Sequence, residues 1–393
     1  LIEMLDVLFF FANLGVDVIR LDAVPFLWKR IGTTGQNLPE AHMILQLFHA
    51  CLRVVAPASA LMAEAVVEPK EIVRYFGEGD YAGRECEMAY HVFLMVLLWD
   101  CIATGNTRLL RRGLETTHDI PHDVTWFTYI RCHDDIGLGY ADDDIREAGY
   151  DPTLHRQFIL EYYTGEYPGS TARGRRFMAD PESGDARISG SAASLLGLEY
   201  AKEQGDEEEL FRAIDRLTML YGLVCSIGGI PILYYGDEVG YGNDYSYREE
   251  PGHRHDNRWM HRPRIDWQHM ERRHEEGTAE ERVFSRITNL VGVRKSLPEL
   301  GADAGFALLH PPNEHLVAFL RYTPEARTLV VANVSGLPQY TDAALLSQAG
   351  ITAPAHDAIS DDRVQPVSRS LVLEPYRIYW LRETLRSPEH VLH

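Results

Sequence analysis

The chain has 393 residues, of which 45% are hydrophobic and 24% are charged, as is typical of a globular protein with a large buried core. Its formal net charge of −20 argues against binding to nucleic acid or to an anionic membrane surface. The five cysteines are scattered and include no CxxC pair, so we predict free thiols, no metal or other cofactor and a cytoplasmic location. The chain begins at Leu1 inside a helix-like apolar pattern, and we expect the protein's N-terminus to lie upstream of it.

After a first helical segment over 1–13, short β-branched segments alternate with longer amphipathic ones. The strands predicted from this pattern cover 16–24, 60–67, 126–131 and 230–235, and the predicted helices cover 39–56, 91–105, 206–226 and 281–296. Strands that alternate with helices predict βα units and a parallel sheet. Residues 136–194 break this alternation and are rich in Gly, Asp, Tyr and Pro, so we interpret them as a long excursion over the sheet.

The pattern changes after about Gly301. Segments 315–322, 327–334 and 370–382 are short, apolar and separated by turn residues, which is typical of antiparallel strands. The sequence therefore predicts a small β domain at the C-terminal end.

A first candidate for chemistry is the pair Arg20 and Asp22. Residues two apart in a strand point to the same face, so the guanidinium would favour the ionised carboxylate. An ionised carboxylate held in place is the nucleophile that a retaining glycosidase needs. The alternative is a buried ion pair at a strand end.

A second candidate is Glu64, an isolated acid in the apolar segment 60–67. Burying a lone carboxyl group costs free energy unless it is paired or functional. Apolar surroundings also raise its pKa, which suits a general acid at neutral pH. The alternative is a surface glutamate on an amphipathic strand.

The third candidate is the polar segment Arg131 to Gly137, which contains His133, Asp134 and Asp135 at the end of a predicted strand. These groups could bind sugar hydroxyls and stabilise positive charge, or they could cap a helix or lie in a solvated loop. The three candidates end different strands of one βα series. In a (β/α)8 barrel such strand ends meet at one face, so their conjunction is more informative than any one of them.

These segments resemble the α-amylase family of glycoside hydrolases. The resemblance is carried by GVDVIRLDAV at 15–24, AEAVV at 63–67, CHDDIG at 132–137 and IPILYYGDEVG at 230–240. Three further segments are similar to the amylosucrase branch of that family, namely NLPEAH at 37–42, RISGSAASLLGL at 187–198 and DNRWMHRPR at 256–264.

The resemblance implies an α/β fold, an incomplete (β/α)8 TIM barrel comprising about strands 4 to 8, with a long loop insertion and a C-terminal antiparallel β domain. We therefore expect a partial catalytic barrel over 1–299, an inserted loop domain at about 136–197 and a β-sandwich over 300–393. The family's first motifs and first three barrel strands have no counterpart here, so we expect the chain to be inactive by itself.

Carried over residue by residue, the resemblance makes Asp22 the nucleophile and Arg20 its positioning partner. Glu64 becomes the general acid/base. It follows that Asp22, Glu64 and Asp134 are the expected catalytic carboxylates.

The remaining expected residues would bind substrate. His133 and Asp134 would hold sugar hydroxyls, and Asp135 would line the sucrose pocket. Arg258 would close the base of that pocket with an acidic partner upstream of Leu1, while Arg187 is a weaker candidate on the acceptor side.

The implied enzyme cleaves sucrose by a retaining double displacement, releases fructose and transfers glucose to an α-glucan or maltooligosaccharide acceptor. Two alternatives stay open. One is a sucrose hydrolase or another α-glucosidase of the same family, and the other is a non-catalytic carbohydrate-binding fragment. We predict no nucleic-acid or membrane partner, and the sequence leaves the oligomeric state unknown.

Overall fold

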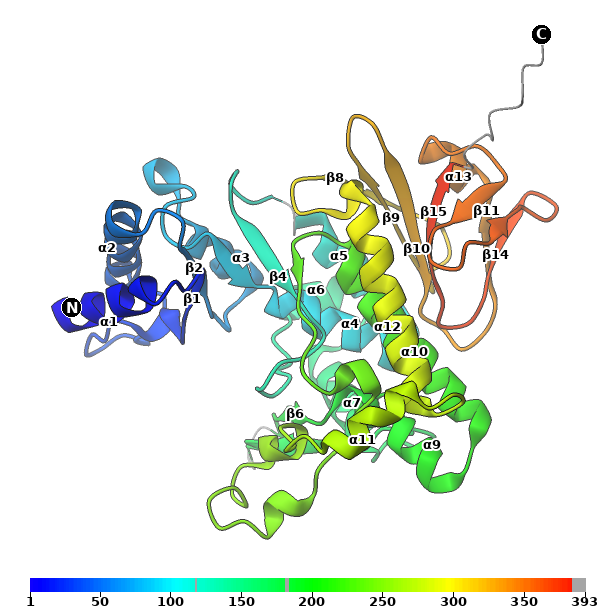
Figure 1. Cartoon of the computed structure of the whole chain (residues 1–393), viewed down its shortest axis with the longest axis horizontal. Coiled ribbons are helices and arrows are strands. Elements are labelled where there is room, and N and C mark those ends of the chain that lie inside the picture. Colours follow the sequence, from blue (N-terminus) through cyan, green and yellow to red (C-terminus); the bar gives the residue numbers. More distant parts are fainter. Residues whose placement is uncertain (117–118, 181–183, 384–393) are drawn as a thin grey trace.

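A five-stranded parallel sheet forms the N-terminal half of the molecule in the computed structural model, which describes residues 1–116, 119–180 and 184–383 (Figure 1). Its strand order is β1-β2-β3-β4-β7, and each strand pairs in parallel with the next. The strands are β1 (Val18–Leu21), β2 (Ala60–Ala63), β3 (Met88–Tyr90), β4 (Thr125–Thr128) and β7 (Ile230–Pro231). This alternation of strands and helices is the one that the hydrophobic pattern predicted.

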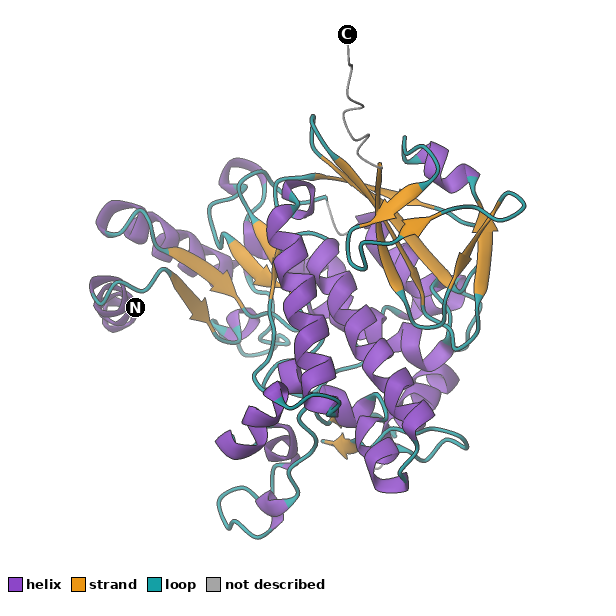
Figure 2. Ribbon diagram, turned by 45° about the vertical axis from the view of Figure 1, so that its right-hand side comes forward, coloured by secondary structure: helices purple, strands orange, loops and turns teal. Residues whose placement is uncertain are grey.

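Helices connect these strands and cover the sheet (Figure 2). The helices are α1 (Ile2–Asn13), α2 (Pro39–Val55), α3 (Pro69–Ile72), α4 (Val92–Thr104), α5 (Arg108–Thr116), α6 (Asp142–Glu147), α7 (Pro152–Thr164), α8 (Ala192–Leu195), α9 (Leu198–Gln204), α10 (Glu207–Ser226), α11 (Trp267–Glu271), α12 (Ala279–Ser296) and α13 (Ala344–Gln348). Within the described ranges, none of them is both long and apolar enough to cross a bilayer.

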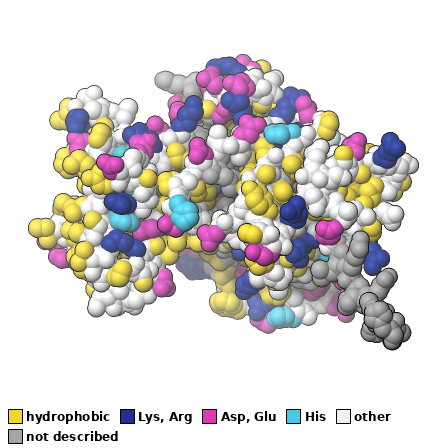
Figure 3. All heavy atoms as spheres, turned by 90° about the horizontal axis from the view of Figure 1, so that it is seen from above, with side chains coloured by type: hydrophobic (Ala, Val, Ile, Leu, Met, Phe, Trp, Pro, Cys, Tyr) yellow, Lys and Arg dark blue, Asp and Glu magenta, His cyan; other side chains and the backbone are white. Residues whose placement is uncertain are grey.

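The sheet is open, with β1 at one edge and β7 at the other. Helix α1, which lies beside β1, buries Leu8 but leaves many large apolar side chains exposed: Leu1, Ile2, Met4, Val7, Phe10, Phe11 and Leu14. Hydrophobic side chains gather at the left end of Figure 3, the end at which Figure 1 draws α1. Five parallel strands with covering helices, followed by a β domain, confirm the predicted fold class.

Two segments of the chain differ from the pattern-based prediction. Strand β3 was not predicted, because its three residues Met88–Tyr90 are too few to show a period. Residues 136–194 were predicted as an excursion, and they contain helices α6 and α7 and a two-stranded hairpin of β5 (Arg175–Phe177) and β6 (Arg187–Ser189). Local structure in this segment therefore holds Arg187 on a strand.

The C-terminal part is an antiparallel β domain. Its six-stranded sheet has the order β13-β12-β15-β10-β9-β8, and β11 pairs with β14 in a second sheet. The strands are β8 (Gly305–Leu309), β9 (Leu316–Tyr322), β10 (Arg327–Asn333), β11 (Gln339–Asp342), β12 (Ala355–Asp357), β13 (Arg363–Val364), β14 (Ser370–Leu373) and β15 (Ile378–Glu383). One face of the larger sheet packs against α10 in a continuous apolar core, and the last ten residues of the expected domain lie outside the described ranges.

Candidate active site

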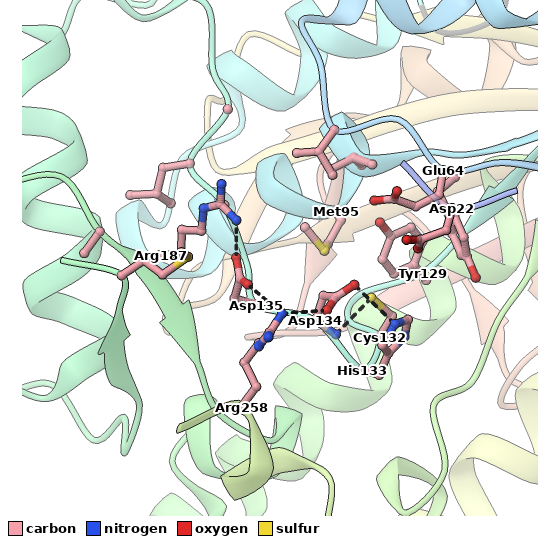
Figure 4. A pocket seen from close by; sticks show the side chains of 18 of the residues that line it. Asp22, Glu64, Met95, Tyr129, Cys132, His133, Asp134, Asp135, Arg187 and Arg258 are labelled. Atoms are coloured by element: carbon pink, nitrogen blue, oxygen red, sulfur yellow. Dashed lines mark hydrogen bonds and ion pairs between the residues drawn. The ribbon is translucent and has the colours of Figure 1, made fainter. Parts of the chain in front are cut away.

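A cleft of about 960 Å³ lies at the carboxyl ends of β1, β2 and β4 (Figure 4). All eight residues that the sequence put forward line it: Arg20, Asp22, Glu64, His133, Asp134, Asp135, Arg187 and Arg258. They come from five separate segments of the chain, and parallel strand ends bring three of those segments together. The volume is within the range of sites that bind small molecules.

The ion pair of Arg20 and Asp22 is formed as the two-residue spacing predicted. The Arg20 Nη1 atom lies 2.7 Å from Asp22 Oδ1, and the two side chains are 26% and 76% exposed. Burial opposes the charge of Arg20, but the hydrogen bond and the negative charge of Asp22 outweigh it and raise the pKa of Arg20. The guanidinium also lies over the ring of Tyr90, 5.6 Å from its centroid. The arginine is thus held from two sides and fixes the carboxylate beside it.

Glu64 follows β2 directly and is bonded to the turn that carries Asp22. The Ala23 N–H donates to Glu64 Oε2 at 2.8 Å, and the Val24 N–H donates to the Glu64 carbonyl at 3.1 Å. Ala23 has a left-handed backbone with φ of +47°, which is what aims its amide at the carboxylate. Burial raises the pKa of Glu64, while the Ala23 hydrogen bond and the charge of Arg20 act in the opposite direction.

The Ala23 amide makes a pH-dependent prediction. Ala23→Val should weaken the bond to Glu64, because a β-branched residue is strained in the left-handed region. The hydrogen bond from Ala23 lowers the pKa of Glu64, so its loss should raise that pKa. Glu64 would then stay protonated up to a higher pH. We expect the alkaline limb of kcat/KM for α-glucoside cleavage to move to higher pH. Ala23→Gly keeps both the amide and the backbone conformation, and it should leave the limb in place.

Asp134 is held by two arginines and a histidine, of which Arg258 and His133 are labelled in Figure 4. Its carboxylate lies 3.0 Å from Arg258 Nη1, 3.4 Å from Arg262 Nη2 and 3.2 Å from His133 Nε2. These contacts fix the orientation of an acid that is only about one-third exposed. Asp22, Glu64 and Asp134 therefore face one cavity, each with its own positioning partners.

Arg258 and Arg187 lie on the side of the cleft away from Asp22 and Glu64 (Figure 4). Arg258 forms ion pairs with Asp256 Oδ2 at 2.7 Å and with Asp134 Oδ1 at 3.0 Å. Arg187 Nη1 is 3.4 Å from Asp135 Oδ2, and half of its side chain is exposed. Burial raises the pKa of Asp135, and the charge of Arg187 opposes that effect. The result is a wall of ion-paired arginines and aspartates opposite the two strand-end carboxylates.

Several contributing residues were not picked out by the sequence analysis. Tyr90 and Tyr129 line the cleft, and they sit on or next to the short strands β3 and β4. His261 is buried, and its Nδ1 accepts the Gly190 N–H at 3.1 Å, which leaves Nε2 to donate to the His133 carbonyl at 3.2 Å. Burial and the nearby Arg131 lower the pKa of His261 to about 3, so the ring is neutral. No local motif signals these roles, because each depends on a contact distant in sequence.

Cys132, His133 and Asp134 bring a thiol, an imidazole and a carboxylate within 4.8 Å of one another. A thiol must lose its proton to bind a metal ion. Burial raises the pKa of Cys132 to about 11, which disfavours the thiolate at neutral pH. The absence of a metal site thus stays a prediction, and the trio's arrangement fits the sugar-binding role expected of His133 and Asp134.

Below the cleft, Arg131 and Asp237 form a fully buried ion pair. Arg131 Nη2 lies 2.7 Å from Asp237 Oδ1, and the Tyr221 hydroxyl donates to Asp237 Oδ2 at 2.5 Å. The pair joins β4 and the turn after β7, directly beneath the segment that carries Asp134. Asp237 is therefore a structural residue and does not reach the cleft.

Asp237→Asn should destabilise the fold by about 3–5 kcal/mol, because it leaves the buried Arg131 charge uncompensated. Urea unfolding followed by circular dichroism measures the change. Glu238→Gln alters the neighbouring acid, which is only half-buried, and should cost about 0.5 kcal/mol or less. Equal effects of the two substitutions would contradict a structural role specific to Asp237.

Known proteins are similar to this chain in sequence. Residues 307–382 match the family model described as the amylosucrase C-terminal domain. The trehalose synthase/amylase of Mycolicibacterium smegmatis is 34% identical over 240 residues, which cover 61% of this chain and 34% of that protein. The glucosylglycerate phosphorylase of Escherichia coli is 25% identical over 97% of this chain and 63% of its own length.

Solved structures give the same picture of the fold. The sucrose 6F-phosphate phosphorylase of Thermoanaerobacter thermosaccharolyticum superposes with a TM-score of 0.63 at 18% identity, over 84% of this chain and 58% of that one. The chain thus spans between about one-third and just under two-thirds of the length of these relatives. Residues 307–382 match the amylosucrase C-terminal domain, and the chain as a whole is similar to the α-amylase family of glycoside hydrolases, which confirms the resemblance to that family.

Proposed function

We propose that the chain carries the catalytic groups of a retaining α-glucoside-processing enzyme, which takes glucose from sucrose and transfers it to an α-glucan acceptor with release of fructose. The observation that supports this most directly is the convergence of Asp22, Glu64 and Asp134 on one cleft. Arg20 holds Asp22, and burial raises the pKa of Glu64, so the two carboxyl groups are suited to different tasks.

In the first step, Asp22 attacks the anomeric carbon as Glu64 donates its proton to the fructosyl oxygen. The glycosidic bond breaks, fructose leaves, and a β-glucosyl ester forms on Asp22. Asp134, held by Arg258 and His133, would bind sugar hydroxyls and stabilise the positive charge of the transition state. In the second step, Glu64 takes a proton from an acceptor hydroxyl, which attacks the ester and restores the α-linkage.

Trapping of the ester tests this proposal. A ring-fluorinated α-glucosyl fluoride slows both steps but keeps an excellent leaving group, so the ester should accumulate on the protein. Mass spectrometry of peptides should locate the added sugar on Asp22. A label on another residue would rule out the assigned nucleophile.

Trapping suits this chain because we expect slow turnover by residues 1–393 alone. The Asp22 side chain is 76% exposed, and β1 pairs only with β2 among the described strands. An open, water-filled cleft positions and desolvates a substrate poorly. Stable ester formation needs only the first step and does not require efficient turnover.

Phosphate is a second candidate acceptor, and the names of two relatives point to it. Four arginines line the cleft, namely Arg156, Arg187, Arg258 and Arg262, but each is ion-paired with an aspartate and would have to exchange that partner for phosphate. Phosphate attack on the ester would yield α-glucose 1-phosphate, and two of the relatives are phosphorylases by name. With sucrose as donor, formation of glucose 1-phosphate in phosphate buffer would select phosphorolysis, and elongation of maltoheptaose would select glucan synthesis.

A further inference from the structure

A second cleft, of about 520 Å³, lies between helices α10 and α12 and the C-terminal β domain. In Figure 1 the two helices run side by side next to this domain. The cleft shares no lining residue with the active site. The residues that the argument uses are Asp215, Arg286, Asn289, Glu374, Tyr376 and Arg377.

Charged groups of both signs line this cleft, and they are arranged in pairs. Asp215 on α10 forms an ion pair with Arg286 on α12. Arg377 Nη2 lies 3.8 Å from Asp357 and 3.6 Å from Asp362. Each of these guanidinium groups already faces a carboxylate, and Asp215 would repel an incoming anion. The cleft is therefore poorly suited to phosphate or to an acidic sugar.

A carboxylate beside a guanidinium group offers hydrogen-bond acceptors and donors side by side. This arrangement suits the hydroxyl groups of a neutral ligand, because a hydroxyl both donates and accepts. The Asp215 and Glu374 carboxylates can accept, while the Arg286 guanidinium can donate. Asn289, which lines the cleft, donates its Nδ2 to the Ile359 carbonyl at 2.9 Å and so ties α12 to the β domain. Both halves of the cleft thus contribute polar groups from rigid elements.

Tyr376 supplies an aromatic surface among these polar groups. The Arg216 guanidinium lies 4.8 Å from the ring centroid and holds the ring in place. The backbone of Tyr376 is left-handed with φ of +49°, and a Cβ on Gly336 would lie 3.2 Å from its hydroxyl oxygen. The missing side chain at Gly336 and the left-handed backbone of Tyr376 therefore make room for the ring beside the cleft that it lines.

From these observations we propose that the cleft binds a neutral saccharide of one to a few hexose units. The apolar C–H face of a sugar would pack on Tyr376, and its hydroxyls would bond to Asp215, Arg286 and Glu374. A ligand here touches α10, α12 and the β domain together, so binding would also hold the domain against the helices. The proposal concerns a separate site and does not depend on the reaction in the active cleft.

Isothermal titration calorimetry of the full chain with maltotriose tests this site. We expect two sites in the unmodified chain, of which Tyr376→Gly removes one and Arg258→Ala the other. Tyr376→Gly suits the left-handed backbone, so it should delete the ring without adding strain. Tyr340→Ala changes an exposed tyrosine of the same domain outside the cleft, and both sites should persist.

Glu374→Gln provides a milder variant whose folding is not in question, and it should weaken the second site about tenfold. The proposal would be overturned if no site in the unmodified chain were weakened by Tyr376→Gly and Glu374→Gln, whether one site or two were seen. Tighter binding of glucose 1-phosphate than of maltotriose at this site would also overturn it, since that would show an anion site.

Discussion

In the full-length gene product, Asp22→Asn should lower sucrose cleavage by a factor on the order of 10⁵, as loss of the nucleophile does in other enzymes with covalent intermediates. The amide has almost the same shape as the carboxylate and can still accept a hydrogen bond from Arg20, so the turn should keep its conformation. What is lost is the negative charge that attacks the anomeric carbon. Fructose release, measured by a coupled assay at saturating sucrose, reports the change.

Asp17→Asn is the matched control for that substitution. Asp17 precedes the same strand β1, but it lies at the opposite end and its side chain is exposed. Fructose release should therefore be unchanged. If Asp22→Asn kept a substantial part of the rate while Asp17→Asn kept all of it, the carboxylate would be a charge stabiliser and another group would be the nucleophile.

The residues that line the cleft could be predicted from the sequence better than their partners could. Asp22 and Glu64 directly follow β1 and β2, Asp134 lies in the loop after β4, and a parallel sheet brings its strand ends together at one edge. The neighbour of Arg20 was predictable for the same local reason, because a two-residue spacing in a strand fixes a common face. The partners of Arg258 were harder to predict, because its contact with Asp134 joins residues that are 124 positions apart in the sequence.

There is also a physical reason why β3 and the conformation of Ala23 were not predicted from the sequence. β3 is a three-residue strand that pairs with β2 and β4 through backbone bonds, so its assignment depends on neighbours and not on its own pattern. The left-handed Ala23 could not be foreseen, because alanine has no preference for that region. That conformation aims an amide at Glu64, and it exists because the surrounding turn imposes it.

Glu64→Gln should separate substrates by their leaving groups. With sucrose the fructosyl oxygen must be protonated as it leaves, so loss of the acid should cost about 10²- to 10⁴-fold. α-Glucosyl fluoride leaves without protonation, so ester formation from it should be far less affected. Fluoride release measured with an ion-selective electrode, beside fructose release from sucrose, gives the two rates on one preparation.

Glu78→Gln, at an exposed position outside the cleft, should leave both rates unchanged. Equal losses on both substrates would mean that the Glu64 carboxylate acts through its bonds to Ala23 and the Asp22 turn, with the proton supplied by another group.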